Sequence, residues 1–271
     1  MRNGVGGRQA VDAWRSRLED LRHRGYGGWV IRPHRAISRI PFRRRDLAVV
    51  LLLPLAFNLA QLLLLDQTAA LWRLILAFWN NRLDLGGVPG DRVFDIGYLR
   101  LYLPQVEIAG GPPGATIWWW TLTACAAVFA ATFYIPPERL LPGIYIVRAC
   151  AAIQASALAY FYAMPGAFPY DLESYVGTNL FSGLVLMFLI PWLLALTYYI
   201  FDFPLFQKVS LTALILAFFA VEIPMQYLFH AFLLQRFSML FMPILYIVFG
   251  MFANVLLLIA MYSWGMRWRM R

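Results

Sequence analysis

The chain has 271 residues, of which 61% are hydrophobic and 14% are charged, and its mean hydropathy is +0.63. This composition leaves too little polar surface to cover a water-soluble globule, so it excludes a soluble domain and predicts an integral membrane protein. The net charge is +9, but most of the excess lies in one N-terminal stretch, which argues against nucleic acid as a partner. Cys125 and Cys150 lie in apolar segments and indicate neither a disulfide framework nor a cysteine metal site.

Six segments are long and apolar enough to cross a bilayer, because a hydrocarbon core of roughly 30 Å needs about 20 helical residues. The first follows a long basic tail, residues 1–46, which is unlike a cleaved signal peptide and indicates a retained anchor. The predicted fold class is an all-α integral membrane protein with six transmembrane helices. The predicted spans are 47–65, 116–135, 143–163, 178–201, 209–234 and 237–266.

The positions of lysine and arginine in the flanks and short connections predict the orientation. In a six-span chain the basic positions of the tail, of two turns and of the basic end 267–271 all fall on one side of the membrane. We assign that side to the cytoplasm of a bacterial-type inner membrane, which places both termini inside. These basic residues are Arg32, Arg35, Arg39, Arg43, Arg44, Arg45, Arg139, Lys208, Arg267, Arg269 and Arg271.

The basic tail contains an amphipathic pattern. Apolar Val11, Trp14, Leu18 and Leu21 recur at helical spacing. This pattern predicts a helix on an anionic inner leaflet, where each arginine gains roughly 1 kcal/mol. Lipid anchoring is one interpretation, and docking of a cytoplasmic partner is the other. The arginines interleaved with the apolar positions are Arg15, Arg17, Arg22 and Arg24.

The segment 66–115, between the first two spans, is predicted to lie outside the membrane. Residues 69–79 are apolar but too short to span and contain Arg73, so they predict an interfacial helix. Alternating residues at about 93–108 predict a small β-ribbon. A ribbon with open edges is excluded from lipid, so we expect it to form an outer cap or to pack on a partner chain.

Glu222, Gln226 and His230 are spaced at i, i+4 and i+8 in the fifth span. They drift by only about 80° around a helix and so form one polar stripe roughly 12 Å long. A carboxylate at the bilayer centre costs about 2.5 to 3.5 kcal/mol, so the stripe is predicted to face the bundle interior. A proton, ion or substrate path is one interpretation, and a buried hydrogen-bonded tie is the other. Candidate polar partners are Asn58, Gln61, Arg148 and Asn254.

The predicted outer surface is rich in aromatic and acidic residues. Such groups stack on sugars or bind a polyprenyl headgroup, whereas the alternative is the ordinary aromatic belt of a membrane interface. The residues that define this outer aromatic and acidic group are Trp118, Trp119, Tyr162, Tyr170, Asp171 and Glu173.

The sequence offers little for independent chemistry. Ser182, followed by Gly183, resembles the serine of the rhomboid proteases, but that family's histidine base belongs on the sixth span, where this chain has none. His23 and His34 are predicted on the opposite side of the membrane from His230. We therefore expect no metal and no cofactor. The gross plan is similar to the permease half of polysaccharide-exporting ABC transporters, although their elaborated outer segment lies between the last two spans.

The sequence favours a non-catalytic multi-pass subunit of a cell-envelope complex, with polysaccharide or lipid-linked glycan assembly or export as the setting. Its expected partners are the lipid bilayer and another membrane or envelope protein or a second copy of the chain. The alternative is a transporter or channel subunit whose path is lined by the stripe. An enzyme that uses the outer aromatic group ranks third.

Overall fold

The computed structural model describes residues 44–96, 99–135, 137–200 and 204–267. The predicted amphipathic tail helix, with Trp14 and its arginines, lies outside the described residues. The elements in chain order are α2 (Arg44–Leu63), α3 (Leu65–Arg82), β1 (Val88–Ile96), β2 (Leu99–Glu107), α4 (Ala115–Ala131), α5 (Pro137–Ala163), α6 (Leu172–Ile200), α7 (Leu205–Phe237), the 3₁₀ turn η1 (Met239–Phe241), α8 (Met242–Tyr246), the π-helical turn η2 (Ile247–Phe252) and α9 (Ala253–Met266).

The described chain has four helices that are long and apolar enough to cross a membrane, or five if the bent pair α2 and α3 forms one span. The structure therefore confirms a mostly helical protein with several candidate membrane-spanning helices and a small two-stranded sheet. Six spans remain a prediction, because α2 and α3 are bent by 61° at their junction and α4 is shorter than the other spans. The candidate spans are Leu140–Ala163, Leu172–Tyr198, Leu205–Phe237 and Met239–Met266.

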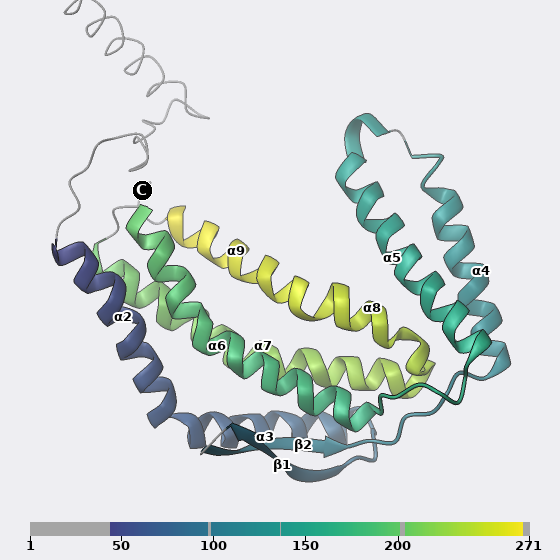
Figure 1. The fold of residues 1–271 in the computed structure, drawn as a ribbon, viewed down its shortest axis with the longest axis horizontal. Coiled ribbons are helices and arrows are strands. Elements are labelled where there is room, and N and C mark those ends of the chain that lie inside the picture. The colour runs from purple at the N-terminus through teal and green to yellow at the C-terminus, as the bar shows by residue number, and fades with distance from the viewer. Residues whose placement is uncertain (1–43, 97–98, 136, 201–203, 268–271) are drawn as a thin grey trace, which may run out of the picture.

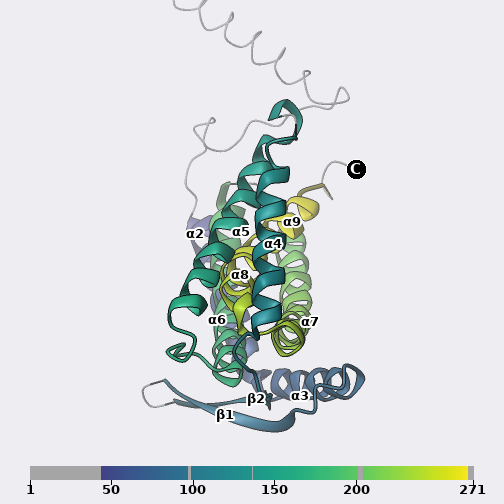
Figure 2. The same ribbon diagram turned by 90° about the vertical axis from the view of Figure 1, so that its right-hand side faces the viewer.

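The long helices run up and down between two ends of the molecule (Figure 1). Helices α2, α5 and α7 run towards the end that carries the sheet, and α4, α6 and α8–α9 run back (Figures 1 and 2). The start of α2 and the end of α9 lie at the same end of the molecule. Helix α3 and the two-stranded sheet lie across the opposite end, which we call the cap end.

The sheet is an antiparallel pair whose register runs from Val88 opposite Glu107 to Ile96 opposite Leu99. It begins at residue 88, earlier than the predicted 93, because Pro89 and Gly90 pair with β2 although they are typical turn residues. Leu103 and Val106 are buried beneath it. Helix α3 is also longer than the predicted 69–79, so the cap is built from more of the 66–115 segment than the sequence pattern indicated.

Trp72 docks α3 onto α7. Its side chain is fully buried, and its Nε1 donates a 2.8 Å hydrogen bond to the carbonyl oxygen of Ala220. That carbonyl has no α-helical donor, because the residue four positions later is Pro224, which lacks an N–H group. The cap helix thus satisfies the backbone group that the proline in α7 leaves free.

Helices α6 and α7 form the centre of the bundle, where Gly183 permits their close approach. A Cβ atom added at Gly183 would lie 2.5 Å from Cγ2 of Ile223 on α7, closer than atoms pack. Small residues at such contacts allow helices in membranes to gain van der Waals contact.

We expect Gly183→Ala to lower the free energy of unfolding by about 1 kcal/mol or somewhat more, because the stiff Ile223 side chain must shift to admit a methyl group. Denaturation with sodium dodecyl sulfate in mixed micelles measures this change. Gly143→Ala is the matched control, because its added Cβ meets no atom within 4 Å. Equal effects of the two substitutions would contradict the packing argument.

Helices α4 and α5 form an antiparallel hairpin that contacts the rest of the bundle mainly where α5 meets η1 and α8. Within the hairpin, Nε1 of Trp118 donates to the Leu158 carbonyl at 3.0 Å. The hairpin diverges from α9 towards the other end of the molecule (Figure 1). In the described part of the chain, α5 and α9 form no packed interface.

Candidate functional site

The three residues of the predicted stripe lie on α7, but they face different neighbours. His230 is only 2% exposed, and its Nδ1 shares a 3.0 Å hydrogen bond with the Tyr175 hydroxyl of α6. The ring of Tyr227 lies 5.4 Å from the imidazole, edge-on. His230 is therefore held between α6 and α7 by one specific partner.

Gln226 contacts the last span where that span is broken. Its Nε2 donates to the carbonyl oxygen of Phe249, within the π-helical turn. Gly250 has non-helical backbone angles (φ −92°, ψ −114°), and the Ala253 N–H bonds to the Gly250 carbonyl instead of the Phe249 carbonyl four residues before it. Breaks of this kind inside helices occur often at functional sites.

Glu222 and Asn254 complete the group of polar side chains between α7 and the last span. Asn254 is 1% exposed at the start of α9 and lies close enough to Tyr227 to interact with its hydroxyl group. Oε2 of Glu222, Oε1 of Gln226 and Oδ1 of Asn254 are buried and have no hydrogen-bond partner. Among the described residues, no basic side chain forms an ion pair with Glu222. We call Glu222, Gln226 and Asn254 the α7–α9 polar group.

Two other candidate partners of the stripe, Asn58 and Arg148, are engaged elsewhere. The amide of Asn58 on α2 donates to the Phe188 carbonyl at 3.1 Å and accepts from Nε1 of Trp192 at 2.9 Å, which ties α2 to α6.

Nε of Arg148 donates to the Thr132 hydroxyl at 3.0 Å, and its guanidinium lies 4.6 Å from the centre of the Phe133 ring. Arg148 thus holds the α4–α5 hairpin together. Gln61 lies one turn after Asn58 on α2, with its Oε1 buried and unpartnered.

The two acidic residues of the predicted outer group, Asp171 and Glu173, bond to the start of α6 and to the sheet. The Ser174 amide donates to Oδ1 of Asp171 at 2.7 Å, so Asp171 caps the first turn of α6. Glu173 accepts a 2.7 Å hydrogen bond from Nε2 of Gln105 on β2. Both carboxylates therefore have structural partners.

The predicted outer aromatic residues lie in two small groups near these acids. The ring of Trp118 packs against Tyr162 at 5.6 Å and against Trp119 at 4.9 Å. Tyr170 packs against Phe168 at 5.7 Å. Trp119, Tyr162 and Tyr170 remain exposed. These rings are accessible for stacking on a sugar or for contact with lipid headgroups.

Asp171 gives a pH-dependent prediction. Hydrogen bonds from the Ser174 side chain and amide hold the pKa of the carboxyl below its ordinary value of 3.8. The carboxylate therefore stabilises the fold above pH 3.8, and this contribution is lost as the pH falls through the folded-state pKa. We expect Asp171→Asn to flatten the loss of thermal stability below pH 4, because asparagine still caps the helix but does not titrate. Asp66→Asn on α3 is the control, and an unchanged pH profile in Asp171→Asn would contradict the assignment.

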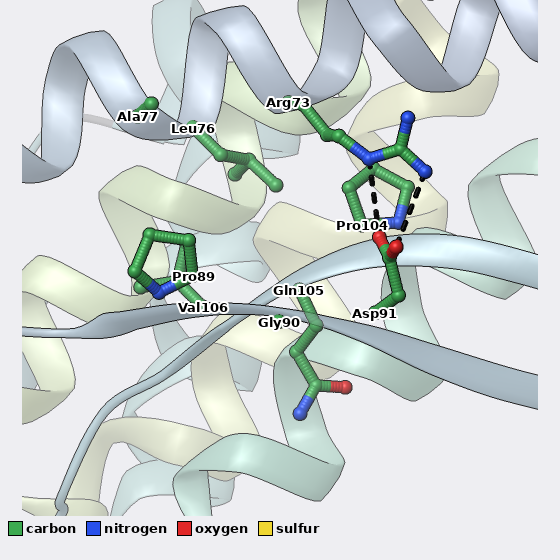
Figure 3. Close-up of a pocket in the computed structure, with 9 residues that line it drawn as sticks. All are labelled: Arg73, Leu76, Ala77, Pro89, Gly90, Asp91, Pro104, Gln105 and Val106. Atoms are coloured by element: carbon green, nitrogen blue, oxygen red, sulfur yellow. Dashed lines mark hydrogen bonds and ion pairs between the residues drawn. The ribbon is translucent and has the colours of Figure 1, made fainter.

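A cavity of about 240 Å³ lies between α3 and the sheet (Figure 3). Arg73 on α3 and Asp91 on β1 close one side of it with two hydrogen bonds of 3.2 Å each. The side chains of this ion pair are 50% and 42% exposed, so solvent screens the interaction. Because each charged group already has its partner and Gln105 points away from them in Figure 3, the cavity offers no free charge for a ligand.

No family model, curated protein or solved structure matches this chain.

Sequence reasoning missed two features beside the stripe. Tyr175 bonds to His230, and Tyr227 lies beside Asn254, but tyrosine is too common at membrane interfaces to mark a site by itself. The break at Gly250 leaves a single glycine as its signal, and glycine is frequent in membrane helices.

Proposed function

We propose that the protein is a non-catalytic multi-pass subunit of a cell-envelope complex in a bacterial-type inner membrane. In this proposal α2, α4, α5, α6, α7 and the last span each cross the bilayer, with both termini on the cytoplasmic side and the cap end outside. The alternating directions of the helices in Figure 1 support this topology. A reporter fused after Arg271 that is active only outside the cell would contradict it.

The observation that carries the proposal is the incomplete packing of the α4–α5 hairpin. Helix association in membranes depends on van der Waals contact rather than on escape from water. The hairpin obtains such contact with the bundle chiefly near η1 and α8, and α5 lacks it along α9. Ile146 on α5 and Ile259 on α9 are large exposed apolar side chains on two helices that, among the described residues, form no packed interface with each other. A transmembrane helix of a partner protein fits this arrangement by supplying the missing contacts.

The proposed setting is the assembly or export of a polysaccharide or a lipid-linked glycan. Exposed Trp119, Tyr162 and Tyr170 support it, because aromatic faces stack on sugar rings. These residues lie near the cap end, where such a substrate would meet the outer leaflet.

Photo-crosslinking in intact membranes tests the partner proposal. We expect photoreactive residues at Ile146 and Ile259 to trap the same membrane protein, because its helix would contact both α5 and α9. Leu52 is the control position, because it is equally apolar and exposed but lies on α2. A second copy of this chain trapped at both sites would identify a homo-oligomer. Adducts of lipid alone, together with a monodisperse monomer after gentle extraction, would contradict the subunit function.

A second candidate function is transport through the bundle, and the break at Gly250 beside Gln226 favours it. Discontinuous helices commonly form ion and substrate sites near the bilayer midplane in transporters. We expect Glu222→Gln to abolish ion flux in proteoliposomes while the protein remains folded. Glu107→Gln on the exposed sheet edge is the control. Unchanged flux in Glu222→Gln would reject Glu222 as part of a path.

A further inference from the structure

We propose that Glu222, Gln226 and Asn254 form a binding site for one dehydrated monovalent metal cation, of which Na⁺ is the representative, between α7 and the broken last span. This inference is independent of the partner protein. It deepens the second candidate function, because it names the ion that a path would carry, but binding does not require flux.

The polar side chains of α7 and the last span lie at neighbouring levels of the same helix interface. Gln226 donates to the Phe249 carbonyl, and Asn254, five residues further along the last span, lies beside Tyr227 of α7. Glu222 lies one turn before Gln226 on the same face of α7, and it also interacts electrostatically with Tyr227. The proposed site therefore takes its three side chains from one stretch of the interface between α7 and the last span.

The unsatisfied atoms of the polar group are all of the kind that binds a hard cation. Glu222 Oε2, Gln226 Oε1 and Asn254 Oδ1 are all oxygens, all buried and all without a donor. A buried polar group without a hydrogen bond costs roughly 1 to 3 kcal/mol in proteins, so three together call for a common ligand. Carboxylate, amide and carbonyl oxygens are the ligands that hard cations prefer.

The net charge of the polar group favours a monovalent cation. The group contains one carboxylate, and the described residues supply no basic partner, since Arg148 is engaged with Thr132. One monovalent cation neutralises Glu222, whereas a divalent cation would leave an uncompensated charge within the bilayer. A proton on Glu222 would provide only one hydrogen-bond donor, which cannot satisfy both amide oxygens. A coordinated metal cation satisfies all three oxygens at once.

The break in the last span adjoins the proposed site. Regular helices have no spare carbonyl groups in their interior, whereas interrupted helices in transporters present carbonyl oxygens to Na⁺. Gly250 interrupts the last span between Phe249 and Asn254, beside two members of the polar group.

The experiment measures the thermal unfolding midpoint of the purified full-length chain in detergent as NaCl replaces choline chloride at constant ionic strength. We expect the midpoint to rise and to saturate with Na⁺, because a ligand that binds only the folded state stabilises it. LiCl should act similarly, and choline chloride should have no effect. Glu222→Gln and Asn254→Ala should each abolish the rise. Gln154→Ala is the matched control: like Gln226, Gln154 donates to a backbone carbonyl, that of Leu240, and has a buried Oε1 without a partner, but it lies on α5, outside the proposed site. This variant should therefore be less stable yet keep the Na⁺ response.

The proposal is overturned if choline produces the same rise or if Glu222→Gln retains it. It is also overturned if acidification without Na⁺ reproduces the stabilisation and Na⁺ adds nothing, because the ligand would then be a proton. Should Glu222→Gln fail to fold, Glu222→Asp and ²³Na nuclear magnetic resonance of the unmodified protein provide the same test. Saturable Na⁺ binding without ²²Na⁺ flux in proteoliposomes would keep the site and reject only the transport function.

Discussion

Replacing Trp72 with alanine is expected to lower the free energy of unfolding by about 3 to 5 kcal/mol, the range for a fully buried tryptophan. The loss has two parts. Removal of the indole ring leaves a cavity between α3 and α7, and the Ala220 carbonyl next to Pro224 loses its hydrogen bond from Nε1. Unfolding in mixed micelles with increasing sodium dodecyl sulfate measures the change.

Two further variants separate these contributions. Trp72→Phe keeps most of the apolar volume but removes the N–H group, so we expect a loss of about 1 to 3 kcal/mol, the cost of an unpaired buried acceptor. Trp120→Ala is the matched control, because the Trp120 ring is exposed on α4, and it should change the stability by less than about 0.5 kcal/mol. A Trp72→Ala variant as stable as Trp120→Ala would show that the cap does not brace α7.

The buried pair of Tyr175 and His230 is expected to behave as a coupled unit. Tyr175→Phe leaves the imidazole without its partner and should lower the free energy of unfolding by about 2 kcal/mol. His230→Leu should lower the free energy of unfolding by a similar amount, because it leaves the Tyr175 hydroxyl without its hydrogen-bond partner. The double variant should cost clearly less than the sum, because removing both polar partners leaves no unpaired group.

The same micelle titration on the four members of this cycle gives the coupling energy. Tyr170→Phe is the control, because the Tyr170 ring is exposed near the cap end. Additive effects of Tyr175→Phe and His230→Leu would contradict a direct bond. Retained Na⁺ stabilisation in Tyr175→Phe would further show that the tie to α6 and the α7–α9 polar group have separate roles.

Physical reasoning on the sequence predicts an interior position for the stripe, but it does not predict how its residues divide among their neighbours. A carboxylate, an amide and an imidazole at four-residue spacing are expensive in lipid, so an interior orientation was expected. Over eight residues the drift of about 80° turns His230 towards α6, while Gln226 contacts the last span. Which neighbour each residue meets depends on helix packing, and spacing alone does not determine packing.

The cap shows a similar limit. Apolar alternation indicated β2 well, because Leu103 lies on the buried face and Tyr102 on the exposed face. The first half of β1 contains Pro89, Gly90 and Asp91, which favour a turn locally. Pairing with β2 overrides that preference, and pairing is a long-range property. The break at Gly250 likewise lies beside a long-range contact, that of Phe249 with Gln226, and has no local hydropathy signal.

The length of α4 has a consequence for the surrounding lipid. Its 17 residues extend about 25 Å, several ångströms less than an average hydrocarbon core. Arg148 of α5 donates a hydrogen bond to Thr132 at the C-terminal end of α4. This bond holds a permanent charge at a depth where the acyl chains of the lipid would otherwise continue. If α4 crosses the bilayer, the bilayer must become thinner around it, at a cost of a fraction of a kcal/mol per ångström of hydrophobic mismatch. Such a deformation attracts other short helices, so the membrane itself would help to recruit neighbours to this flank.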